Sequence, residues 1–416
     1  MNRSLKIGMF GFGCVGQGLY DILENNEGFR AELVKICVKD RTKPRKLPSR
    51  YFTFDKEDIL ENPEINLVVE LINDADEAYH IVTTALKKGK IVVTANKKML
   101  AEHLAELVAL QEQYDTALLY EASACGSIPI IRNLEEYYDN ELLFAVSGIM
   151  NGSSNYILSK IFNENLSYHT ALKQAQDLGF AETDPTLDVG GFDALNKLCI
   201  LAVHAYGTLI RPEDAFNYGI QSLSVHDIQF AKEKGYKIKL LASVRKTQEN
   251  AITAFVIPQF IKKEDYLYNV ENEYNGVTVE AAFADRQFFM GKGAGGHPTG
   301  SAVLSDISAS RYQYKYEYKK LAQHHNIRYT TEHQLEVYLR YHDEEDLELL
   351  RFTEISEKYS GKNFNYVIGI VSLKHLTHIK AELASRNIFI AATGQKLNQP
   401  QELVYNHATA AKELVP

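Results

Sequence analysis

The segment LKIGMFGFGCVGQG, residues 5–18, decides how the chain begins to fold. Its first six residues, Leu5 to Phe10, form a nearly continuous apolar run, which is typical of a parallel strand buried on both faces. The run ends in a G-x-G-x-x-G pattern, residues 11–16, and a helical stretch follows. A strand, a glycine turn and a helix in this order predict a dinucleotide-binding βαβ unit of the Rossmann type.

Each position of the glycine turn has a physical role in such a unit. Gly11 allows the tight turn, Gly13 lets a pyrophosphate approach the backbone, and Gly16 lets the helix pack on the strand. The helix N-terminus, with Cys14 and Val15, faces the phosphates. We therefore expect these five residues to bind the cofactor, although a tight turn without a ligand would use glycine in the same way.

The end of the second strand, VKDRTKPR at residues 38–45, bears on the choice of cofactor. Asp40 could bind ribose hydroxyls, as in NAD enzymes, whereas basic residues accept the 2′-phosphate of NADP. Lys39, Arg41 and Lys43 surround the aspartate and favour NADP. A solvated basic loop explains the same residues, so NADP and NAD both stay open.

Alternating apolar runs and helical stretches extend this unit into a doubly wound α/β domain. The further predicted strands are Leu33–Val38, Leu67–Leu71, Ile91–Ala95 and Ala117–Tyr120, with helices at Asp76–Lys88 and Lys98–Tyr114. From residue 131 the order of the predicted strands and helices changes to that of an α+β catalytic domain. It has a strand at Glu141–Ile149, helices at Ser153–Phe162, His169–Leu178 and Phe192–Tyr206, and extended segments at Ala251–Pro258 and Val277–Met290.

The C-terminal part predicts a third domain. Its elements are a strand (Gln334–Tyr341), a helix (Leu347–Tyr359), two strands within Asn363–Val371, a helix (His375–Arg386) and a strand (Ile388–Ala392). This βαββαβ order is that of the ferredoxin-like motif. The predicted domains are residues 1–130, completed by a helix around 298–325, then 131–297 as the catalytic and dimerisation domain, and 329–416.

Composition excludes several classes of protein. A chain of 416 residues needs two or three cores, and a net charge of −9 argues against a nucleic-acid groove. No apolar run reaches the ~18 residues of a membrane span, and the N-terminus has no signal-peptide core. The four cysteines form no CxxC pair, so neither a zinc site nor a disulfide framework is expected. We expect a cytoplasmic protein that binds neither membrane nor nucleic acid.

The segment GFAETDPTLDVGGFDALNK, residues 179–197, holds several closely spaced acidic residues and a lysine that are candidates for a functional site. Three carboxylates, those of Glu182, Asp184 and Asp188, lie on a short loop between glycines. Asp193 and Lys197 follow at i and i+4 on one helical face. An acidic surface loop beside a helix salt bridge would be the plainest interpretation. An acidic pocket for an ammonium group, with a lysine as proton donor, explains more of these residues.

Several motifs in a fixed order resemble the homoserine dehydrogenase family over roughly residues 5–320. They are the glycine turn at 11–16, Ala95-Asn-Lys-Lys98, Glu121-Ala-Ser123, Gly148-Ile-Met-Asn-Gly-Ser-Ser-Asn155, residues 182–197, and Gly291-Lys-Gly-Ala-Gly-Gly-His-Pro-Thr299. The family reduces L-aspartate 4-semialdehyde to L-homoserine with NADH or NADPH, on the path to threonine and methionine.

The resemblance implies roles for individual residues. Lys197 matches the proton donor to the carbonyl oxygen, and Lys97 matches a lysine that contacts both cofactor and substrate. Glu182 and Asp193 match the substrate-binding acids, and Asp188 is a further candidate. Hydride addition builds negative charge on oxygen, which a positioned ammonium stabilises and protonates.

The resemblance extends to three further features. Gly293 and Gly295 would cover the nicotinamide end of the cofactor, unless they form a hairpin bulge. A structural monovalent cation, such as Na⁺, would be held by the Glu121 carboxylate and by the carbonyls of Ala124, Gly126 and Ile128. The chain would form a homodimer through its catalytic domain.

The C-terminal βαββαβ segment resembles the ACT module, which many of these enzymes use for threonine feedback. The turn after its first strand, YHDEEDL at residues 341–347, lacks the Pro and Gly usual in that module and carries four consecutive carboxylates. These would repel an amino acid's α-carboxylate. A module kept for packing or dimerisation is therefore favoured over an amino-acid sensor.

Two other functions fit part of the sequence. A semialdehyde dehydrogenase would need a thiol nucleophile, for which Cys125 is the candidate, but no activating histidine is evident nearby in the sequence. A catalytically inactive NAD(P)-binding sensor would not need Lys97, Lys197, Glu182 and Asp193, all of which are present.

Overall fold

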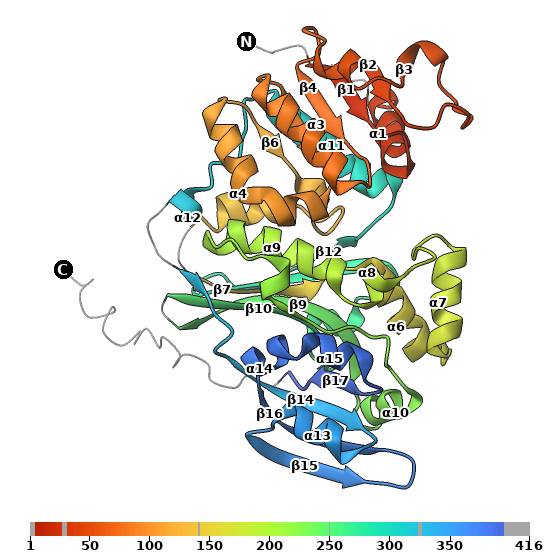
Figure 1. Cartoon of the computed structure of the whole chain (residues 1–416), viewed down its shortest axis with the longest axis vertical. Helices are drawn as coiled ribbons and strands as arrows, with labels where there is room; N and C mark the ends of the chain where they lie inside the picture. The colour runs from red at the N-terminus through yellow and green to blue at the C-terminus, as the bar shows by residue number, and fades with distance from the viewer. Residues whose placement is uncertain (1–4, 27–30, 140–141, 249, 323–326, 395–416) are drawn as a thin grey trace, which may run out of the picture.

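The computed structural model describes residues 5–26, 31–139, 142–248, 250–322 and 327–394. Its first part, red and orange in Figure 1, is a parallel sheet with the strand order β3-β2-β1-β4-β5-β6. The strands are β1 (Leu5–Phe10), β2 (Ala31–Cys37), β3 (Phe52–Thr53), β4 (Leu67–Glu70), β5 (Ile91–Thr94) and β6 (Leu118–Leu119). This is the strand order of a doubly wound Rossmann sheet, so the predicted fold class is confirmed.

The helices of this part begin directly after the strands that they follow. They are α1 (Cys14–Glu24), α2 (Glu57–Leu60), α3 (Ala75–Lys87) and α4 (Lys97–Gln113). The Asn96 side chain caps α4 by accepting the Met99 N–H, which fixes Lys97 as the first helical residue after β5. The carboxyl ends of parallel strands share one edge of the sheet, so Lys97 lies on the same edge as the glycine turn that follows β1.

Helix α11 (Gly296–Ser310) returns to this part and packs against α1, as the sequence predicts (Figure 1). It ends at Ser310, however, and not near residue 325. In the segment that follows, every second residue is a tyrosine, and Tyr316 and Tyr318 are both buried against α9. In a continued helix, residues two positions apart would point in different directions, so both could not be buried there. A short helix, α12 (Lys319–Ala322), comes next, and residues 323–326 lie outside the described residues.

The second part is built on a mixed sheet, of which Figure 1 shows the green strands in the middle of the molecule. Its strands are β7 (Leu143–Ile149), β8 (Phe216–Asn217), β9 (Lys237–Gln248), β10 (Ala251–Ile261), β11 (Tyr274–Ala281) and β12 (Asp285–Lys292). Its helices are α5 (Ile130–Arg132), α6 (Gly152–Glu164), α7 (Tyr168–Asp177), α8 (Thr186–Val189), α9 (Phe192–Tyr206) and α10 (Val225–Glu233). The predicted extended segment Val277–Met290 is an antiparallel hairpin of β11 and β12. Glu141, where the first strand of this part was predicted to begin, lies outside the described residues.

Helix α9 places the chemistry of residues 179–197. It packs against β9 and β10 on one side and against α4 on the other, so it is buried nearly all round. Gly191, with a φ of +80°, is the N-cap of the helix, and Gly207, with a φ of +66°, is its C-cap. The first turn of α9 therefore lies where the dinucleotide-binding part meets the second sheet (Figure 1).

The C-terminal part follows the predicted βαββαβ order. Its elements are β14 (Gln334–Tyr341), α13 (Glu344–Leu350), β15 (Glu354–Ser360), β16 (Asn365–Ser372), α14 (Leu373–His378), α15 (Lys380–Ser385) and β17 (Phe389–Ala392), after the short strand β13 (Arg328–Tyr329). The strands lie in the order β17-β14-β16-β15, and the pair Gln259–Ala392 joins β17 to β10 of the second part. Residues 395–416 of the predicted third domain lie outside the described residues.

Two predictions within this part were wrong. The helix expected over Leu347–Tyr359 covers Glu344–Leu350 only, and strand β15 follows it. Ile355 and Tyr359 stand four residues apart in a polar segment, a helical spacing, but their conformation is set by pairing with β16. The two strands expected within Asn363–Val371 are the single strand β16, whose partner β15 precedes it.

Candidate active site

The glycine turn between β1 and α1 leaves room for a ligand at one position. Gly11 has a φ of +91°, and a Cβ there would lie 2.7 Å from the Leu71 carbonyl oxygen. A Cβ on Gly16 would lie 2.7 Å from the Gly11 carbonyl oxygen. Around Gly13, by contrast, no atom lies within 4 Å of the Cβ position, so the backbone faces open space. A pyrophosphate has room to approach the backbone there.

A second helix N-terminus meets this turn. Helix α1 begins at Cys14, with Val15 in its first turn, and α11 begins at Gly296 after Gly295. A Cβ on Gly296 would lie 2.6 Å from the Cys14 carbonyl oxygen, so the two N-termini are in contact. Neither helix has a capping side chain or an acidic residue in its first turn. Free N–H groups and two helix dipoles therefore favour an anion at this place.

The basic loop after β2 is exposed, and its aspartate is turned inward. The Asp40 carboxylate accepts hydrogen bonds from the Thr42 N–H and hydroxyl, both at 2.8 Å, and from the Lys43 N–H at 3.2 Å. The Arg41 guanidinium lies 4.5 Å above the Phe54 ring, and Lys39 pairs with Asp74 on α3 at 3.4 Å. The loop thus presents cationic groups, while its carboxylate is engaged within the loop.

Two lysines from different parts of the chain meet on one carboxylate. The Lys97 Nζ lies 2.9 Å from Asp193 Oδ1, and the Lys197 Nζ donates to Asp193 Oδ2 at 2.7 Å. Lys197 also donates to the Met150 carbonyl oxygen at 2.6 Å. Lys197 and Asp193 are buried, whereas the Lys97 side chain is 42% exposed. Asp193 and Lys197, the i, i+4 pair of the sequence, are therefore two members of a three-residue ion-pair bridge, Lys97–Asp193–Lys197.

The other predicted acids lie at different distances from this bridge. Asp188, on α8, is joined to Asp193 through Asn151, whose Nδ2 donates to Asp188 Oδ1 at 2.7 Å and to Asp193 Oδ2 at 2.9 Å. Glu182 is exposed, and its backbone carbonyl oxygen accepts from the Gln176 side chain at 3.0 Å. Its charge still reaches Lys97, whose pKa it helps to raise. The structure thus brings Lys97, Asp188, Asp193 and Lys197 together and leaves Glu182 at the rim.

The electrostatics of the bridge keep its central carboxylate charged. Burial raises the pKa of Asp193, but the two lysine charges and the Asn151 amide outweigh it and hold that pKa well below its usual value. The Asp193 charge raises the pKa of Lys97. Burial raises the pKa of Asp188, and the nearby Asp193 charge raises it further. Asp188 therefore titrates more readily than Asp193.

The turn predicted to hold a cation surrounds a buried carboxylate. Glu121 accepts the Ile131 N–H at 2.8 Å and the Arg132 N–H at 2.9 Å, so its two oxygens already engage the start of α5. The backbone passes through positive φ at Cys125 and Gly126. Cys125 itself is fully buried, and burial raises the pKa of its thiol to about 12. Among the described residues, no group of three His, Cys, Asp or Glu side chains is placed to hold a metal.

The second glycine turn lies against an unpaired amide. A Cβ on Gly293 would lie 2.2 Å from Asn275 Oδ1, so only glycine fits in this backbone position. Asn275 is fully buried on β11, and neither its Oδ1 nor its Nδ2 has a hydrogen-bond partner among the described residues. A Cβ on Gly126 would lie 2.7 Å from the Gly293 carbonyl carbon and oxygen. The glycine turn therefore packs directly on the Glu121–Ile128 segment.

The histidines have structural surroundings. His204 is buried on α9 between the Tyr120 hydroxyl and the Glu135 carboxylate, each at 2.8 Å. His297 lies in the first turn of α11, with its Nε2 3.4 Å from Asp21.

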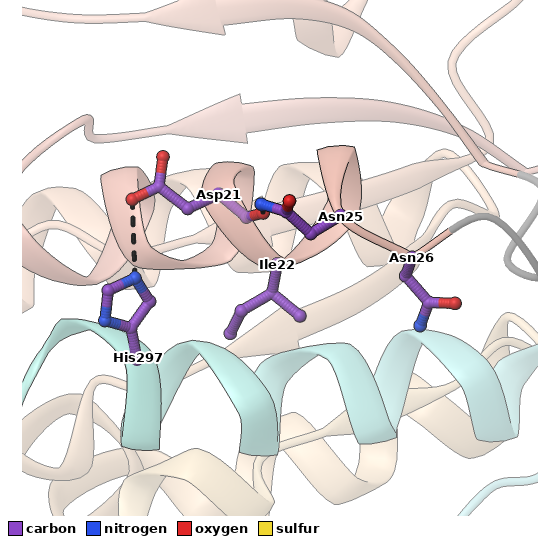
Figure 2. A pocket seen from close by; sticks show the side chains of 5 residues that line it. All are labelled: Asp21, Ile22, Asn25, Asn26 and His297. Atoms are coloured by element: carbon purple, nitrogen blue, oxygen red, sulfur yellow. Dashed lines mark hydrogen bonds and ion pairs between the residues drawn. The ribbon is translucent and has the colours of Figure 1, made fainter.

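A pocket of about 570 Å³ lies where His297 faces α1. Figure 2 shows Ile22 of α1 pointing toward α11 and Asp21 paired with His297. Asp21 and Ile22 belong to the C-terminal half of α1, whereas the glycine turn is at its N-terminus. Of the residues that line the pocket, only His297 comes from the α11 N-terminus that meets the glycine turn.

Sequence reasoning missed two contributors to the site. Asn151 belongs to a motif that was recognised, but its bonds to Asp188 and Asp193 depend on the fold. An asparagine followed by glycine at the start of a helix was the available signal, since Asn is a strong N-cap. The contact between the N-termini of α1 and α11 could have been inferred from the adjacent glycines Gly295 and Gly296.

Comparison with known proteins places the chain beside one enzyme family. Residues 129–308 match the family model for homoserine dehydrogenase, and residues 11–121 match the model for the homoserine dehydrogenase NAD binding domain. The homoserine dehydrogenase of Helicobacter pylori is 40% identical over 314 residues, which are 74% of each chain.

Solved structures extend the comparison to the C-terminal part. A homoserine dehydrogenase from Thiobacillus denitrificans has a TM-score of 0.80 at 29% identity and covers 94% of this chain and 98% of its own. A hyperthermophilic archaeal homoserine dehydrogenase in complex with NADPH has a TM-score of 0.64 at 25% identity, covering 75% of this chain and 99% of its own. In the part of the chain that the structure describes, no helix has the length and apolar character needed to span a membrane.

Proposed function

Because the chain belongs to the homoserine dehydrogenase family, we propose that the Lys97–Asp193–Lys197 bridge is the catalytic centre of its reaction. Members of the family are NAD(P)-dependent oxidoreductases that interconvert L-homoserine and L-aspartate 4-semialdehyde. The observation that carries the proposal is that Asp193 holds two ammonium groups, one from α4 and one from its own helix α9.

Lys197 is the proposed proton donor. An ammonium group has three N–H donors, and the Met150 carbonyl and Asp193 take two of them. The third is left for the carbonyl oxygen of the substrate. The reduced nicotinamide supplies the hydride when bound. As negative charge develops on the oxygen, Lys197 stabilises it and transfers its proton from Nζ.

Lys97 and the acids are proposed to position the reactants. Lys97 is half exposed at the N-terminus of α4, so it can contact both cofactor and substrate. Asp188 uses Oδ1 for Asn151, and no described residue bonds its Oδ2, which leaves that oxygen for the substrate ammonium. Glu182, at the rim, adds negative charge that attracts the same ammonium group.

The cofactor is proposed to be NADP in preference to NAD. Gly11 to Gly16 and the N-terminus of α11 would bind the pyrophosphate, and Gly293 and Gly295 would lie beside the nicotinamide end. Arg41 and Lys43 are exposed, and Asp40 is turned into its own loop, which favours a 2′-phosphate over free ribose hydroxyls. Lys39 is a weaker candidate because it pairs with Asp74.

A structural monovalent cation is proposed at the Glu121 turn. The Glu121 carboxylate and the carbonyl oxygens of Ala124, Gly126 and Ile128 are the hard oxygen donors that Na⁺ prefers. Burial raises the pKa of Glu121, and a cation would offset that cost by stabilising the charged form. The Arg132 guanidinium, 3.7 Å from Glu121, already supplies part of this charge, so the cation is proposed as an addition to an existing pair.

A homodimer through the second part is also proposed. The hairpin of β11 and β12 lies at the edge of the sheet, and its Phe283 and Met290 are 66% and 55% exposed. Large exposed apolar side chains at a sheet edge favour association. Sedimentation of the wild type and of Met290→Lys tests this, and an unchanged monomeric mass in both would contradict it.

The domain organisation and the cellular compartment are also proposed. We propose three domains, 1–130, 131–297 and 329–416, with the last an ACT-like module that serves packing more than sensing. Its support is the βαββαβ order and the pair Asp227–Arg340, buried and 3.0 Å apart, which ties it to α10. Four cysteines without disulfides suit a reducing cytoplasm.

One assay tests the catalytic proposal. The purified protein should produce NAD(P)H from L-homoserine and NAD(P)⁺ at alkaline pH, and the rate should depend on Lys197. Absence of homoserine-dependent NAD(P)H production, with Na⁺ or K⁺ present, would contradict it. A protein that binds NADPH but shows no turnover would instead support the alternative of an inactive sensor.

A further inference from the structure

Asn151 is the residue that links Asp188 and Asp193, the two aspartates of the site. It follows strand β7 directly, is 4% exposed, and is the N-cap of helix α6. Its Oδ1 accepts the Ser154 N–H at 2.8 Å. Its Nδ2 donates one hydrogen bond to Asp188 and one to Asp193. Every polar atom of this side chain is therefore engaged.

The capping bond decides which way the amide faces. Only the amide oxygen can accept the Ser154 N–H, so the NH₂ group must point toward the carboxylates. A rotation by 180° would place Oδ1 against two carboxylates and the NH₂ group against an N–H donor. Helix α6 thus fixes a donor of two protons at a place where two acids approach each other.

Among the described residues, Asn151 is the one hydrogen-bond donor that the two carboxylates share. Asp188 lies on α8 and Asp193 on α9, with the Gly190-Gly191 turn between them. The two lysines hold Asp193 from the other side. For the Asp188 carboxylate, Asn151 is the only hydrogen-bond donor among the described residues. Loss of the NH₂ group would therefore free Asp188 more than Asp193.

We propose that Asn151 is a positioning residue, whose NH₂ group holds the Asp188 carboxylate toward the substrate ammonium and braces Asp193 between the two lysines. This inference rests on the proposed function, since it assigns Asp188 to the substrate. A neutral amide suits the task because it stays in place at every pH, whereas a third lysine would titrate and would add charge to a site that already holds two.

The bond from Asn151 to Asp188 affects how kcat/KM for homoserine depends on pH. The groups that face Asp188 are Asp193 and Lys197 on α9, Lys97 on α4 and Asn151 on α6. Burial and the Asp193 charge raise the Asp188 pKa, whereas the Asn151 bond and the lysines lower it. Without the amide donor this pKa rises further. The carboxylate is then lost at a higher pH, so the acidic limb of log(kcat/KM) for homoserine moves to higher pH.

Three variants separate positioning from capping. Asn151→Ser keeps a capping oxygen but has no NH₂ group, Asn151→Asp keeps the cap and adds a third carboxylate, and Asn151→Ala loses both functions. Ser167→Ala is the matched control, because Ser167 caps α7 through the Thr170 N–H, outside the site. KM for homoserine, KM for NADP⁺, kcat, the pH profile and Tm are measured for each.

We expect Asn151→Ser to raise KM for homoserine about 10-fold or more, because a hydrogen bond to a charged group is lost. KM for NADP⁺ and Tm should stay near wild type, and the acidic limb should move to higher pH. Asn151→Asp should be at least as impaired, and Ser167→Ala should lower Tm without changing KM.

Two results would overturn the inference. One is Asn151→Ser with KM for homoserine within twofold of wild type and an unmoved acidic limb. The other is a rise in KM confined to Asn151→Ala, which would make the residue only a helix cap. In both cases the wild type would still oxidise homoserine and still depend on Lys197, so the proposed function would stand apart from this failure.

Discussion

Lys97 Nζ lies 2.9 Å from Asp193 Oδ1, which joins the first residue of α4 to the first turn of α9. The two residues are 96 positions apart, and one belongs to the dinucleotide-binding part while the other lies over the second sheet. Their ion pair therefore links the dinucleotide-binding part to the second part. Buried carboxylates cost free energy unless they are paired, and here both lysines contribute to that pairing.

Lys197→Ala should lower kcat by about 10²–10³-fold, because it removes the donor to the developing oxyanion. NADPH affinity should change little, since Lys197 contacts Met150 and Asp193 and no part of the glycine turn. Steady-state kinetics and NADPH titration measure the two effects. Lys160→Ala is the control, because Lys160 forms a similar i, i+4 pair with Glu164 away from the site. A kcat for Lys197→Ala within threefold of wild type would refute the assigned role.

The double variant Arg41→Ala, Lys43→Ala should raise KM for NADPH about 10- to 100-fold, as expected for lost charge-assisted hydrogen bonds. KM for NADH should be unchanged, because NADH has no 2′-phosphate. Lys46→Ala, three residues further along, is the charge control. If both cofactors lose affinity equally, or if Lys46→Ala has the same effect, the loop acts only as solvated basic surface.

Local sequence signals sufficed for the elements that are bounded by glycine or by caps. Helix α9 was predicted over Phe192–Tyr206, as observed, and Gly191 of the glycine pair before it is its N-cap. Strand β15 was missed because its residues are mostly exposed and polar, so partner strand β16 decides its conformation.

The contacts of the candidate site also fall into those that a local sequence pattern predicts and those that it does not. The Asp193–Lys197 pair follows from helical spacing alone. The bonds of Asp193 to Lys97 and Asn151 join residues 96 and 42 positions apart. No local pattern can give such distances, because they depend on how α4, α6 and α9 pack.

Cys125→Ser should retain turnover within about threefold of wild type. The thiol is fully buried and burial raises its pKa to about 12, so it is not a thiolate at neutral pH. Cys199→Ser, at a second buried cysteine, is the control for the cost of a hydroxyl in the core. Loss of activity in Cys125→Ser alone, with Tm values equal in the two variants, would favour the semialdehyde dehydrogenase alternative.

Glu70→Gln should stabilise the protein at pH 8 and have little effect at pH 5. Burial raises the pKa of Glu70 to about 7, from 4.5 when exposed, so the folded chain binds a proton that the unfolded chain does not. The stability from this proton is fully present below pH 4.5 and is lost as pH rises toward 7. The shift corresponds to roughly 3 kcal/mol at most.

Urea unfolding at pH 5, 6.5 and 8 measures this effect. The Gln oxygen can still accept the Ile72 N–H, and its NH₂ group can donate to the Thr94 hydroxyl oxygen in place of the bond that the carboxylate accepts, so the main change is the loss of charge. Glu112→Gln, at an exposed position, is the control. A difference between Glu70→Gln and wild type that does not grow from pH 5 to pH 8 would contradict the prediction.

Threonine at millimolar concentration should inhibit the enzyme little or not at all. Helix α13 begins at Glu344 after Asp343, and its first turn holds Glu344, Glu345 and Asp346. These carboxylates surround the only N–H groups that the turn after β14 could offer to an amino acid's α-carboxylate, and like charges repel. Asp346 is moreover engaged by Arg386 of the neighbouring segment at 3.2 Å. Initial rates across a threonine series, with the chain truncated after Arg328 as the comparison, measure the effect. A saturable inhibition curve with a midpoint below about 1 mM, abolished by the truncation, would show that the C-terminal part senses threonine in spite of this acidic turn.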